Sequence, residues 1–231
     1  MKVCVIFRGE HVRHNTVYSR DLKRKYVDAI MCWNNWKKHI YDDLINNGDE
    51  CDIAFITYPS EILEQIKNVI NPKHIILNNC ISQRKNFEDV LQFMNDHKDY
   101  DRFVILRCDF TYRFNITKWP KWKENGIFVL NRDVHWSTTK FCSDVLFIVD
   151  SKNVNTFDIA FKDSMNREDM HMHAITTYLY NNNIHFHLMY NEYYHMDNHP
   201  LHSMASLEDQ NDIYKPKDDQ RVLVWNGIVL S

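Results

Sequence analysis

Glycine is scarce in this sequence, since only four of its 231 residues are glycine. The Gly-x-Gly-x-x-Gly fingerprint of dinucleotide-binding proteins is absent, which argues against a dinucleotide site of that type. The chain also lacks an apolar run of about 20 residues, the length that a membrane-spanning helix requires. We therefore expect a protein that does not insert into a membrane.

Paired cysteines are missing as well. The six cysteines stand at wide spacings, several of them inside apolar runs, and no Cys-x-x-Cys pair occurs. This usage is typical of buried free thiols in a reducing compartment. The apolar run at residues 3–7 is followed at once by Arg8 and Glu10, so the start of the sequence predicts a strand and not a signal peptide. We expect a cytoplasmic protein.

An excess of positive charge is also absent. The 28 Lys and Arg residues and the 31 Asp and Glu residues give a net charge of −3. No global positive field attracts the protein to nucleic acid, so we expect no nucleic-acid partner. A hydrophobic fraction of 44% and a charged fraction of 26% are typical of a folded chain. With no internal repeat and no Gly/Ser linker, the length fits one core.

The first half of the sequence alternates short β-branched runs with segments of helical periodicity. That alternation predicts a parallel sheet with crossover helices and a Rossmann-like topology. The expected strands are residues 3–7, 52–57, 73–77 and 102–108, and the expected helices are residues 19–47, a segment opened by Pro59 and Ser60, and residues 86–97.

The second half has a mixed pattern. Strands are expected at residues 127–130, 145–149 and 185–190, and helices at residues 154–162 and 167–182. The segment 208–219 is polar, and residues 221–230 are expected to form a final strand. The predicted fold class is a single α/β domain whose central, mixed and mostly parallel sheet is flanked by helices.

Ligands of open α/β sheets bind beyond the carboxyl ends of the strands, so polar residues there are candidates for binding. Arg8, Gly9 and Glu10 follow the first strand, and Gly9 allows a nucleotide to approach the backbone closely. An ion pair that caps the sheet explains Arg8 and Glu10 equally well. Tyr58 follows the second strand, as a platform for a base or as a packed surface tyrosine.

Asp109 is the strongest single candidate, because it ends the apolar strand 102–108 and is preceded by Arg107 on that strand. A carboxylate there can hold a divalent cation that neutralises a nucleotide diphosphate. The alternative is a structural carboxylate at a strand end. Arg107 and Asp109 are both assigned to nucleotide binding.

Histidines crowd the segment 193–202. An imidazole from His195 or His199 can complete the coordination sphere that Asp109 begins, which suits Mn²⁺ better than Mg²⁺. The alternative is a polar loop whose histidines titrate near neutrality. The pair His171 and His173 falls on a predicted helix, where the two side chains diverge, so a three-histidine zinc site is disfavoured.

Asp133, after the strand 127–130, and Asp169, at the start of a predicted helix, are candidate catalytic residues. Either carboxylate can contact sugar hydroxyls or act as a base toward an acceptor hydroxyl. For Asp169 the helix macrodipole is a sufficient structural explanation. Trp119 and Trp122 can stack on sugar rings or pack in the interior.

Several of these segments together resemble one family. The sequence over most of residues 1–207 resembles the amino-terminal glycosyltransferase domains of chlorella-virus enzymes that build the capsid-protein glycan. The matching segments are residues 3–10, 71–73, 103–109, 131–136, 187–190 and 199–202.

The resemblance implies a fold of the GT-A type, a UDP-sugar donor, Mn²⁺ (or Mg²⁺) dependence and retention of anomeric configuration. It implies a glycan or glycoprotein acceptor and, for a viral enzyme, a place in the host cytoplasm. Asp109 matches the metal-binding strand end, although this chain has Asp109-Phe110-Thr111 where such enzymes have Asp-x-Asp. Arg8, Gly9 and Tyr58 match the uridine pocket.

The expected organisation is a glycosyltransferase domain over residues 1–207, followed by a polar tail over residues 208–231. Within the domain, residues 1–110 bind the nucleotide and residues 111–207 bind the sugar and the acceptor. Two alternatives remain open: a nucleotidyltransferase or sugar-nucleotide hydrolase with the same site, and a non-catalytic carbohydrate-binding domain.

Overall fold

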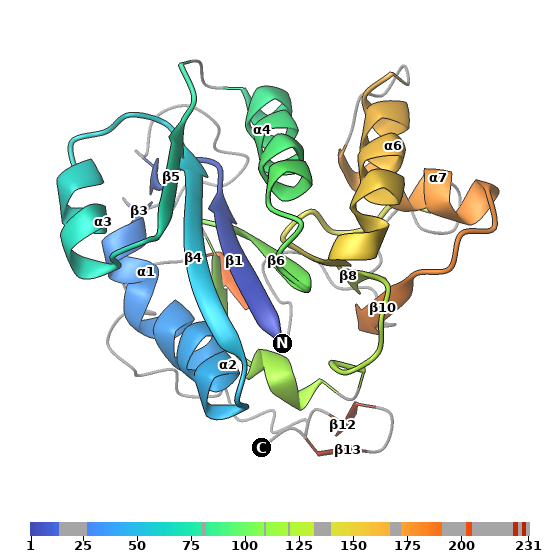
Figure 1. Cartoon of the computed structure of the whole chain (residues 1–231), viewed down its shortest axis with the longest axis horizontal. Coiled ribbons are helices and arrows are strands. Elements are labelled where there is room, and N and C mark those ends of the chain that lie inside the picture. The colour runs from blue at the N-terminus through green and yellow to red at the C-terminus, as the bar shows by residue number, and fades with distance from the viewer. Residues whose placement is uncertain are drawn as a thin grey trace.

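The structure of the chain is a computed structural model (Figure 1). The residues that the structure describes are 1–13, 27–79, 82–108, 110–119, 121–131, 140–166, 172–190, 202–204, 224–225 and 228–229. None of the described helices is long and apolar enough to cross a membrane.

A seven-stranded sheet organises these residues, with the strands in the order β10-β8-β9-β6-β1-β4-β5. All neighbouring strands pair in parallel except that β9 runs antiparallel to both β6 and β8. The strands are β1 (Lys2–Arg8), β4 (Glu50–Thr57), β5 (His74–Leu77), β6 (Arg102–Arg107), β8 (Ile127–Asn131), β9 (Leu146–Asp150) and β10 (His187–Tyr190).

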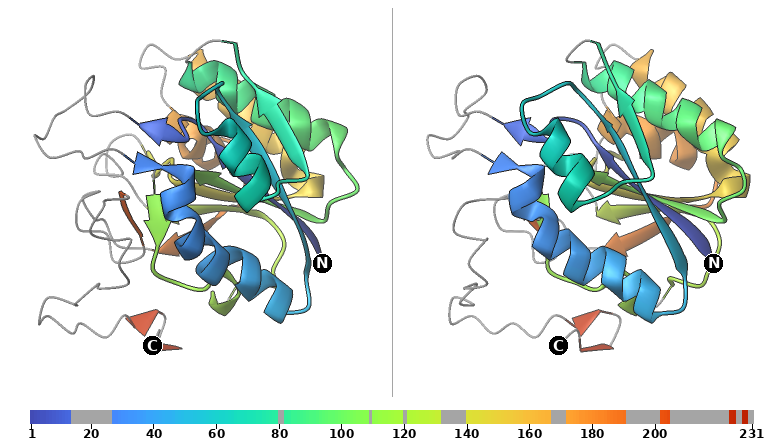
Figure 2. Two further views of the ribbon diagram at one scale, coloured as in Figure 1. Left: turned by 90° about the vertical axis from the view of Figure 1, so that its left-hand side faces the viewer. Right: turned by 60° about the vertical axis from the view of Figure 1, so that its left-hand side comes forward.

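Helices cover both faces of this sheet, as the two views of Figure 2 show. One face carries α1 (Ala29–Trp36), the π-helical turn η1 (Lys37–Tyr41), α2 (Asp42–Asn46) and α3 (Leu63–Val69). The other face carries α4 (Gln83–Asp96), α6 (Val154–Met165) and α7 (Ile175–Asn181). Short 3₁₀ turns lie at η2 (Ile116–Lys118), η3 (Ser151–Asn153) and η4 (Met172–Ala174).

Alternation along β1 shows how the sequence builds these two layers. Val3, Val5 and Phe7 pack into the core beneath α1 and α2, whereas Cys4 and Ile6 pack into the core beneath α4. Successive side chains of a strand point to opposite faces, so a run that is apolar throughout belongs in a sheet covered on both sides.

The first half confirms the predicted Rossmann-like βαβαβαβ order. From β1 the chain adds β4 and then β5 on one side, and it returns to place β6 on the other side of β1. The point between β1 and β6 is therefore a topological switch point, where open α/β sheets bind ligands. The mixed, mostly parallel sheet with flanking helices also matches the predicted fold class.

The expected first helix, residues 19–47, was wrong at its start among the described residues. Val27–Asp28 forms β3, which pairs antiparallel with β2 (Val12–Arg13), and α1 begins only at Ala29. Asp28 ends the strand and caps the helix, because its Oδ1 accepts a hydrogen bond from the Met31 N–H at 2.8 Å. Residues 19–26 lie outside the described residues.

Two further elements differ from expectation. Of the expected helix 167–182, the structure describes η4 and α7, with residues 167–171 outside the described set. The expected final strand 221–230 was wrong in form, because its described residues make two short antiparallel strands, β12 (Val224–Trp225) and β13 (Ile228–Val229). A third small sheet joins β7 (Phe110–Tyr112) to β11 (His202–Met204).

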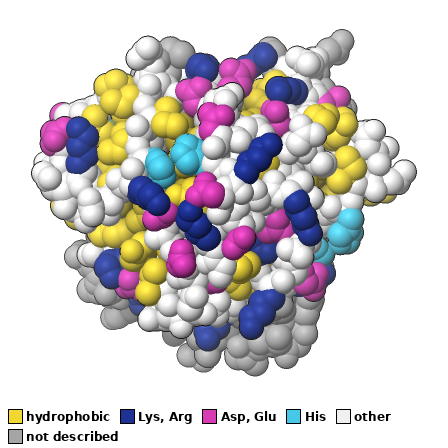
Figure 3. Space-filling view, viewed as in Figure 1, with side chains coloured by type: hydrophobic (Ala, Val, Ile, Leu, Met, Phe, Trp, Pro, Cys, Tyr) yellow, Lys and Arg dark blue, Asp and Glu magenta, His cyan; other side chains and the backbone are white. Residues whose placement is uncertain are grey.

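Charged side chains are mixed on the face seen in Figure 3, where Lys and Arg alternate with Asp and Glu. Charged side chains also form pairs along α4, such as Arg84 with Glu88 and Lys85 with Asp89. Exposed pairs of this kind contribute little to stability, so this face is read as a solvated surface.

Candidate functional site at the carboxyl edge of the sheet

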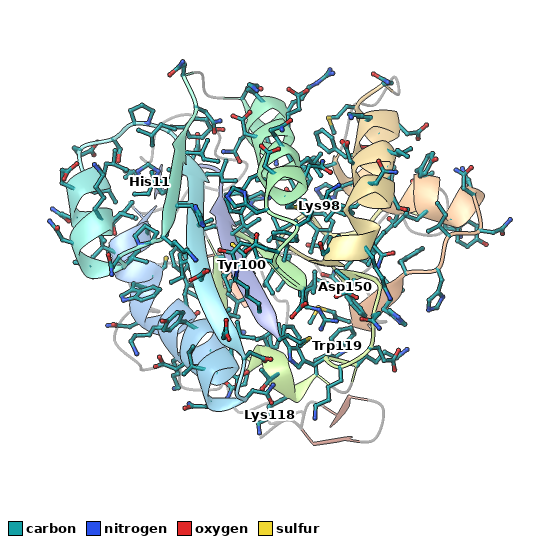
Figure 4. The ribbon with its side chains drawn as sticks, in the orientation of Figure 1. His11, Lys98, Tyr100, Lys118, Trp119 and Asp150 are labelled. Carbon is teal, nitrogen blue, oxygen red and sulfur yellow. The ribbon has the colours of Figure 1, made fainter. Side chains whose placement is uncertain are left out.

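The carboxyl ends of β1, β4, β5, β6, β8 and β10 lie at one edge of the sheet, because these strands run in the same direction. β9 is reversed, so its beginning lies at that edge. Figure 4 shows the two ends of the sheet: His11, shortly after β1, lies toward one, and Asp150, which ends β9, lies toward the other. The carboxyl edge therefore receives the residues that follow six strands and those that precede β9.

A cluster of charged and polar side chains surrounds a buried carboxylate at the switch point. Arg8 ends β1 directly beside Arg107, which ends β6. The carboxylate of Asp144, two residues before β9, accepts from Arg8 Nη2 at 3.3 Å and from Arg107 Nη1 at 3.1 and 3.2 Å. Gln83 Nε2 donates to it at 3.0 Å, and His173 Nε2 lies 3.5 Å from Oδ1. Two guanidiniums, an amide and an imidazole thus converge on one carboxylate.

Asp144 remains ionised in this setting. Burial raises the pKa of its carboxyl, but Arg107, His173 and Arg8 outweigh burial and hold the pKa well below its usual value. Arg8 is as deeply buried as Asp144, with 2% of each side chain exposed, and its guanidinium also donates to the Asp144 carbonyl oxygen and lies over the Phe87 ring. Gln83 is exposed, and Arg107 and His173 are partly exposed, with 17% and 19% of their side chains accessible.

Gly9 continues the edge beyond β1. Its φ of 90° lies in the left-handed region, which favours glycine, and a Cβ built there meets no described atom within 4 Å. The Gly9 N–H donates to the Ile56 carbonyl, and its carbonyl accepts from Thr57 Oγ1 at 2.7 Å. These bonds join the loop after β1 to the end of β4, and among the described residues no atom occupies the side-chain side of Gly9.

A chain of side-chain hydrogen bonds extends from this glycine. His11 is buried, its Nδ1 contacts Thr57 Oγ1, and its Nε2 contacts Ser60 Oγ. Because the Thr57 hydroxyl donates to Gly9, it accepts from His11 Nδ1–H, which leaves Nε2 to accept from Ser60. Burial lowers the pKa of His11 to about 4, against smaller opposing effects of Glu61 and Asp28, so the ring is neutral near pH 7.

Tyr58 also lies at this edge, but its ring is largely covered. Only 8% of the residue is exposed, and its hydroxyl donates to the Ser82 carbonyl at 3.1 Å. That bond ties the end of β4 to the start of α4, which is the packed arrangement offered above as an alternative. Contact with a base remains a prediction.

The structure brings together four of the predicted nucleotide-binding residues, namely Arg8, Gly9, Tyr58 and Arg107, and Glu10 follows them half-buried. The ion pair that was weighed for Arg8 and Glu10 exists for Arg8, but with Asp144. The other candidates lie outside the described residues: Asp109, Asp133, Asp169, His195 and His199.

Sequence reasoning missed Asp144, Gln83, His11 and Ser60, and it set His173 aside. The predicted strand 145–149 offered a signal, because an acidic residue stands directly before that apolar run. Only residues at the ends of strands were considered, however, and an antiparallel strand presents its beginning to the same edge.

Trp119 and Trp122 pack in the interior. They are 2% and 1% exposed, Trp119 contacts the Phe128 ring, and Trp122 lies under the guanidinium of Arg102 at the start of β6. Arg102 also donates to the Trp122 carbonyl oxygen and pairs with Asp150 at 2.6 Å. This cluster lies at the amino end of β6, away from the switch point.

Among the described side chains, no group of three or more His, Cys, Asp or Glu residues is arranged to hold a metal ion. All three predicted metal ligands, Asp109, His195 and His199, fall outside that set. The described strands do show one relevant relation: β11 pairs with β7, so that Met204 lies opposite Phe110 and His202 opposite Tyr112. The backbone at the end of the histidine-rich segment thus lies beside the backbone that directly follows Asp109.

No protein-family model matches the sequence, and no curated protein matches it. Among solved structures, the chain is similar to a protein from Desulfovibrio desulfuricans G20 assigned as a nucleotide-diphospho-sugar transferase. The TM-score is 0.46 and the identity 12%, over 84% of this chain and 81% of that one. Fold and site define an α/β protein with a cluster of polar side chains at a Rossmann-like switch point.

Proposed function

We propose that the protein is a glycosyltransferase of the GT-A type that transfers a sugar from a UDP-sugar to a glycan or glycoprotein acceptor. The observation that carries this proposal is the polar edge at the switch point, where Arg8, Gly9 and Arg107 end or follow two neighbouring parallel strands. Nucleotides bind at this place in open α/β sheets. The resemblance of several segments to chlorella-virus glycosyltransferases supports the sugar-nucleotide donor, retention of configuration and a role in capsid-glycan synthesis in the host cytoplasm.

In this proposal the described residues have distinct tasks. Gly9 lets the nucleotide approach the backbone, because its side-chain side is open. Arg107 is partly exposed beside the switch point and supplies positive charge toward the diphosphate. Arg8 and Arg107 both donate to the carboxylate of Asp144, so Arg8 helps to hold that carboxylate where it positions Arg107. Tyr58 closes the base side of the pocket.

Mn²⁺, or Mg²⁺ in its place, belongs to the proposal, with Asp109, His195 and His199 as the residues that would hold it. A carboxylate with imidazoles is a donor set that suits Mn²⁺. The pairing of β11 with β7 supports the combination, since it brings the backbone near these ligands together. A bound divalent ion would stabilise negative charge on a departing diphosphate. Asp133 and Asp169 remain the proposed contacts to sugar hydroxyls or the acceptor.

A thermal-shift series tests the nucleotide and the metal together. The protein is melted with UDP, GDP or ADP, each with and without Mn²⁺, and we expect the largest stabilisation with UDP and Mn²⁺. Incubation with UDP-sugars and glycan acceptors then tests transfer. Release of free sugar without transfer would indicate a hydrolase. Turnover of UTP with a sugar phosphate would indicate a nucleotidyltransferase. The absence of a thermal shift with any nucleotide would indicate a non-catalytic carbohydrate-binding domain.

Asp109→Ala tests the metal assignment. We expect loss of the Mn²⁺-dependent part of the UDP shift and at least a hundredfold loss of transfer, because carboxylate ligands anchor the ion. The matched control is Asp99→Ala, which removes an exposed carboxylate that pairs with Lys2 near the start of β1. Normal transfer by Asp109→Ala would remove this residue from the mechanism.

A further inference from the structure

Asp144 is the centre of the cluster at the switch point, and it joins elements that are distant in sequence. Its partners come from the ends of β1 and β6, from the first turn of α4 and from η4. The carboxylate is 2% exposed, so it is not itself available to a ligand. Its effect on a ligand can only pass through the side chains that it holds.

Three of those side chains reach the surface: Gln83 is exposed, and Arg107 and His173 are partly exposed. The neutral amide of Gln83 cannot make a charge-assisted bond to a phosphate, so Arg107 and His173 are the candidates for such a contact. Arg107 Nη1 and His173 Nε2 both approach the same oxygen of Asp144, Oδ1, at 3.1 and 3.5 Å, so the guanidinium and the imidazole lie side by side. Both are partly exposed, whereas Arg8 is buried. Arg107 is therefore held by a partner on its inner side while part of its surface faces outward, and the same is true of His173.

The position of His173 is fixed by its backbone as well as by Asp144. Its carbonyl accepts from the Cys142 N–H at 2.9 Å, and Thr176 Oγ1, three residues further on, donates to the Lys140 carbonyl at 2.5 Å. These bonds attach η4 and the first turn of α7 to the segment that leads into Asp144. A binding group held in this way loses little conformational freedom when a ligand arrives.

We infer that His173 and Arg107 together contact the diphosphate of the nucleotide, and that Asp144 is the positioning residue for both. This inference rests on the proposed function and adds two residues to it, His173 and Asp144. A guanidinium donates to phosphate oxygens, and an imidazolium donates from both ring nitrogens, so that His173 can donate from Nε2 to Asp144 and from Nδ1 to a phosphate oxygen. A phosphate contact to a positively charged donor is among the stronger hydrogen bonds in proteins.

The test compares UDP with uridine, which lacks the phosphates, at a fixed Mn²⁺ concentration. The variants are His173→Gln and Arg107→Lys, and binding is measured by isothermal titration or, for weak uridine binding, by ligand-observed NMR. We expect each variant to bind UDP at least about tenfold more weakly, because a charge-assisted contact to the diphosphate is lost. Uridine affinity should change less than about twofold.

Two matched controls accompany these variants. His185→Gln changes an exposed histidine just before β10, at the amino end of that strand, and Arg84→Lys changes an exposed arginine on α4 that pairs with Glu88. Both controls should bind UDP as the wild type does. Unchanged UDP affinity in His173→Gln, or equal losses for UDP and uridine, would overturn the assignment of His173.

Asp144→Asn tests the positioning role. We expect it to lose UDP affinity at least as strongly as His173→Gln does and to retain uridine affinity, and wild-type UDP affinity would overturn the role. Circular dichroism establishes whether this variant folds. If it does not, the double variant His173→Gln/Arg107→Lys provides the test. Because both side chains act on one diphosphate, the double variant should lose more UDP affinity than either single variant. Wild-type protein that binds no UDP would overturn the proposed function itself, whereas wild-type binding with unaffected variants would overturn this inference alone.

Discussion

Buried Arg–Asp pairs lie at both ends of the sheet, and β6 contributes an arginine to each. At its carboxyl end Arg107 shares Asp144 with Arg8, and at its amino end Arg102 pairs with Asp150. Removing one partner of such a pair leaves a buried charge without compensation, which is costly. The first pair borders the proposed ligand, but the second packs against Trp122, so the two should differ in function and not in their importance for stability.

Asp150→Ala separates these effects. We expect a loss of about 3–5 kcal/mol in the free energy of unfolding, because Arg102 is 1% exposed and would remain buried without its carboxylate. The Gly126 N–H would also lose its acceptor, Asp150 Oδ2. Urea denaturation measures the loss. UDP affinity of the folded fraction should stay at the wild-type value, and a selective loss of UDP binding would contradict the division of roles.

Because His11 is buried in its neutral form, we expect the free energy of unfolding to fall as the pH decreases. Its pKa is about 4 in the folded protein and about 6.5 when unfolded, so the unfolded state takes up the proton first as the pH falls. The contribution of the neutral His11 ring to the free energy of unfolding is complete above pH 6.5. It is lost as the pH falls from about 6.5 to about 4, and the total loss is up to about 3 kcal/mol. Urea denaturation across this range measures it. His11→Asn removes the titrating ring, so its stability should fall less steeply with pH, and an identical slope would refute the assignment.

At the scale of elements, single residues decide where strands give way to helices. Asp28 pairs with Val12 in the β2–β3 ribbon and at the same time caps α1, so one side chain sets the boundary between the two. Ser82 has the same role at α4, where its Oγ accepts from the Lys85 N–H at 3.2 Å. The register of α4 in turn places Gln83 beside Asp144. Helix caps therefore help to fix the geometry of the ligand edge.

Asp28→Ala should reduce the free energy of unfolding by about 1 kcal/mol, the usual value of a helix cap. Thermal or urea denaturation checks this value. The control is Asp42→Ala, which removes an exposed carboxylate paired with Lys37 and should cost less than about 0.5 kcal/mol. Equal effects of the two substitutions would mean that the cap contributes nothing beyond a surface charge.

At the scale of the whole molecule, most of the fold could be predicted, because alternating apolar strands and amphipathic helices leave a periodic signal. Helix α4 is an example: Phe87, Val90, Leu91 and Met94 recur at helical spacing and are all buried. The late start of α1 left no such signal, since the ribbon that precedes it depends on pairing with β2. The reversal of β9 depends in the same way on its neighbours.

The candidate site could be predicted only where it follows parallel strands. Arg8, Gly9 and Arg107 were found by this rule, because the end of an apolar run marks the edge of the sheet. Asp144 precedes its strand, and His173 belongs to a 3₁₀ turn, so neither stands at a position that periodicity identifies. Asp144 and His173 come into contact only in the folded chain, where the segment before β9, η4 and the end of β6 lie side by side.

Because β9 runs in the reversed direction, the segment before it can be altered separately from the strand that pairs with β6 and β8. The segment before Asp144 enters the sheet from the ligand side, and pairing with β6 begins only at Leu146. Side chains could be exchanged in residues 140–143 while the register of β9 between β6 and β8 is kept. A library of donor preference for the proposed glycosyltransferase is therefore best built from side-chain changes in residues 140–143, because a change in length there would displace the backbone bonds from Lys140 and Cys142 that hold η4 and α7.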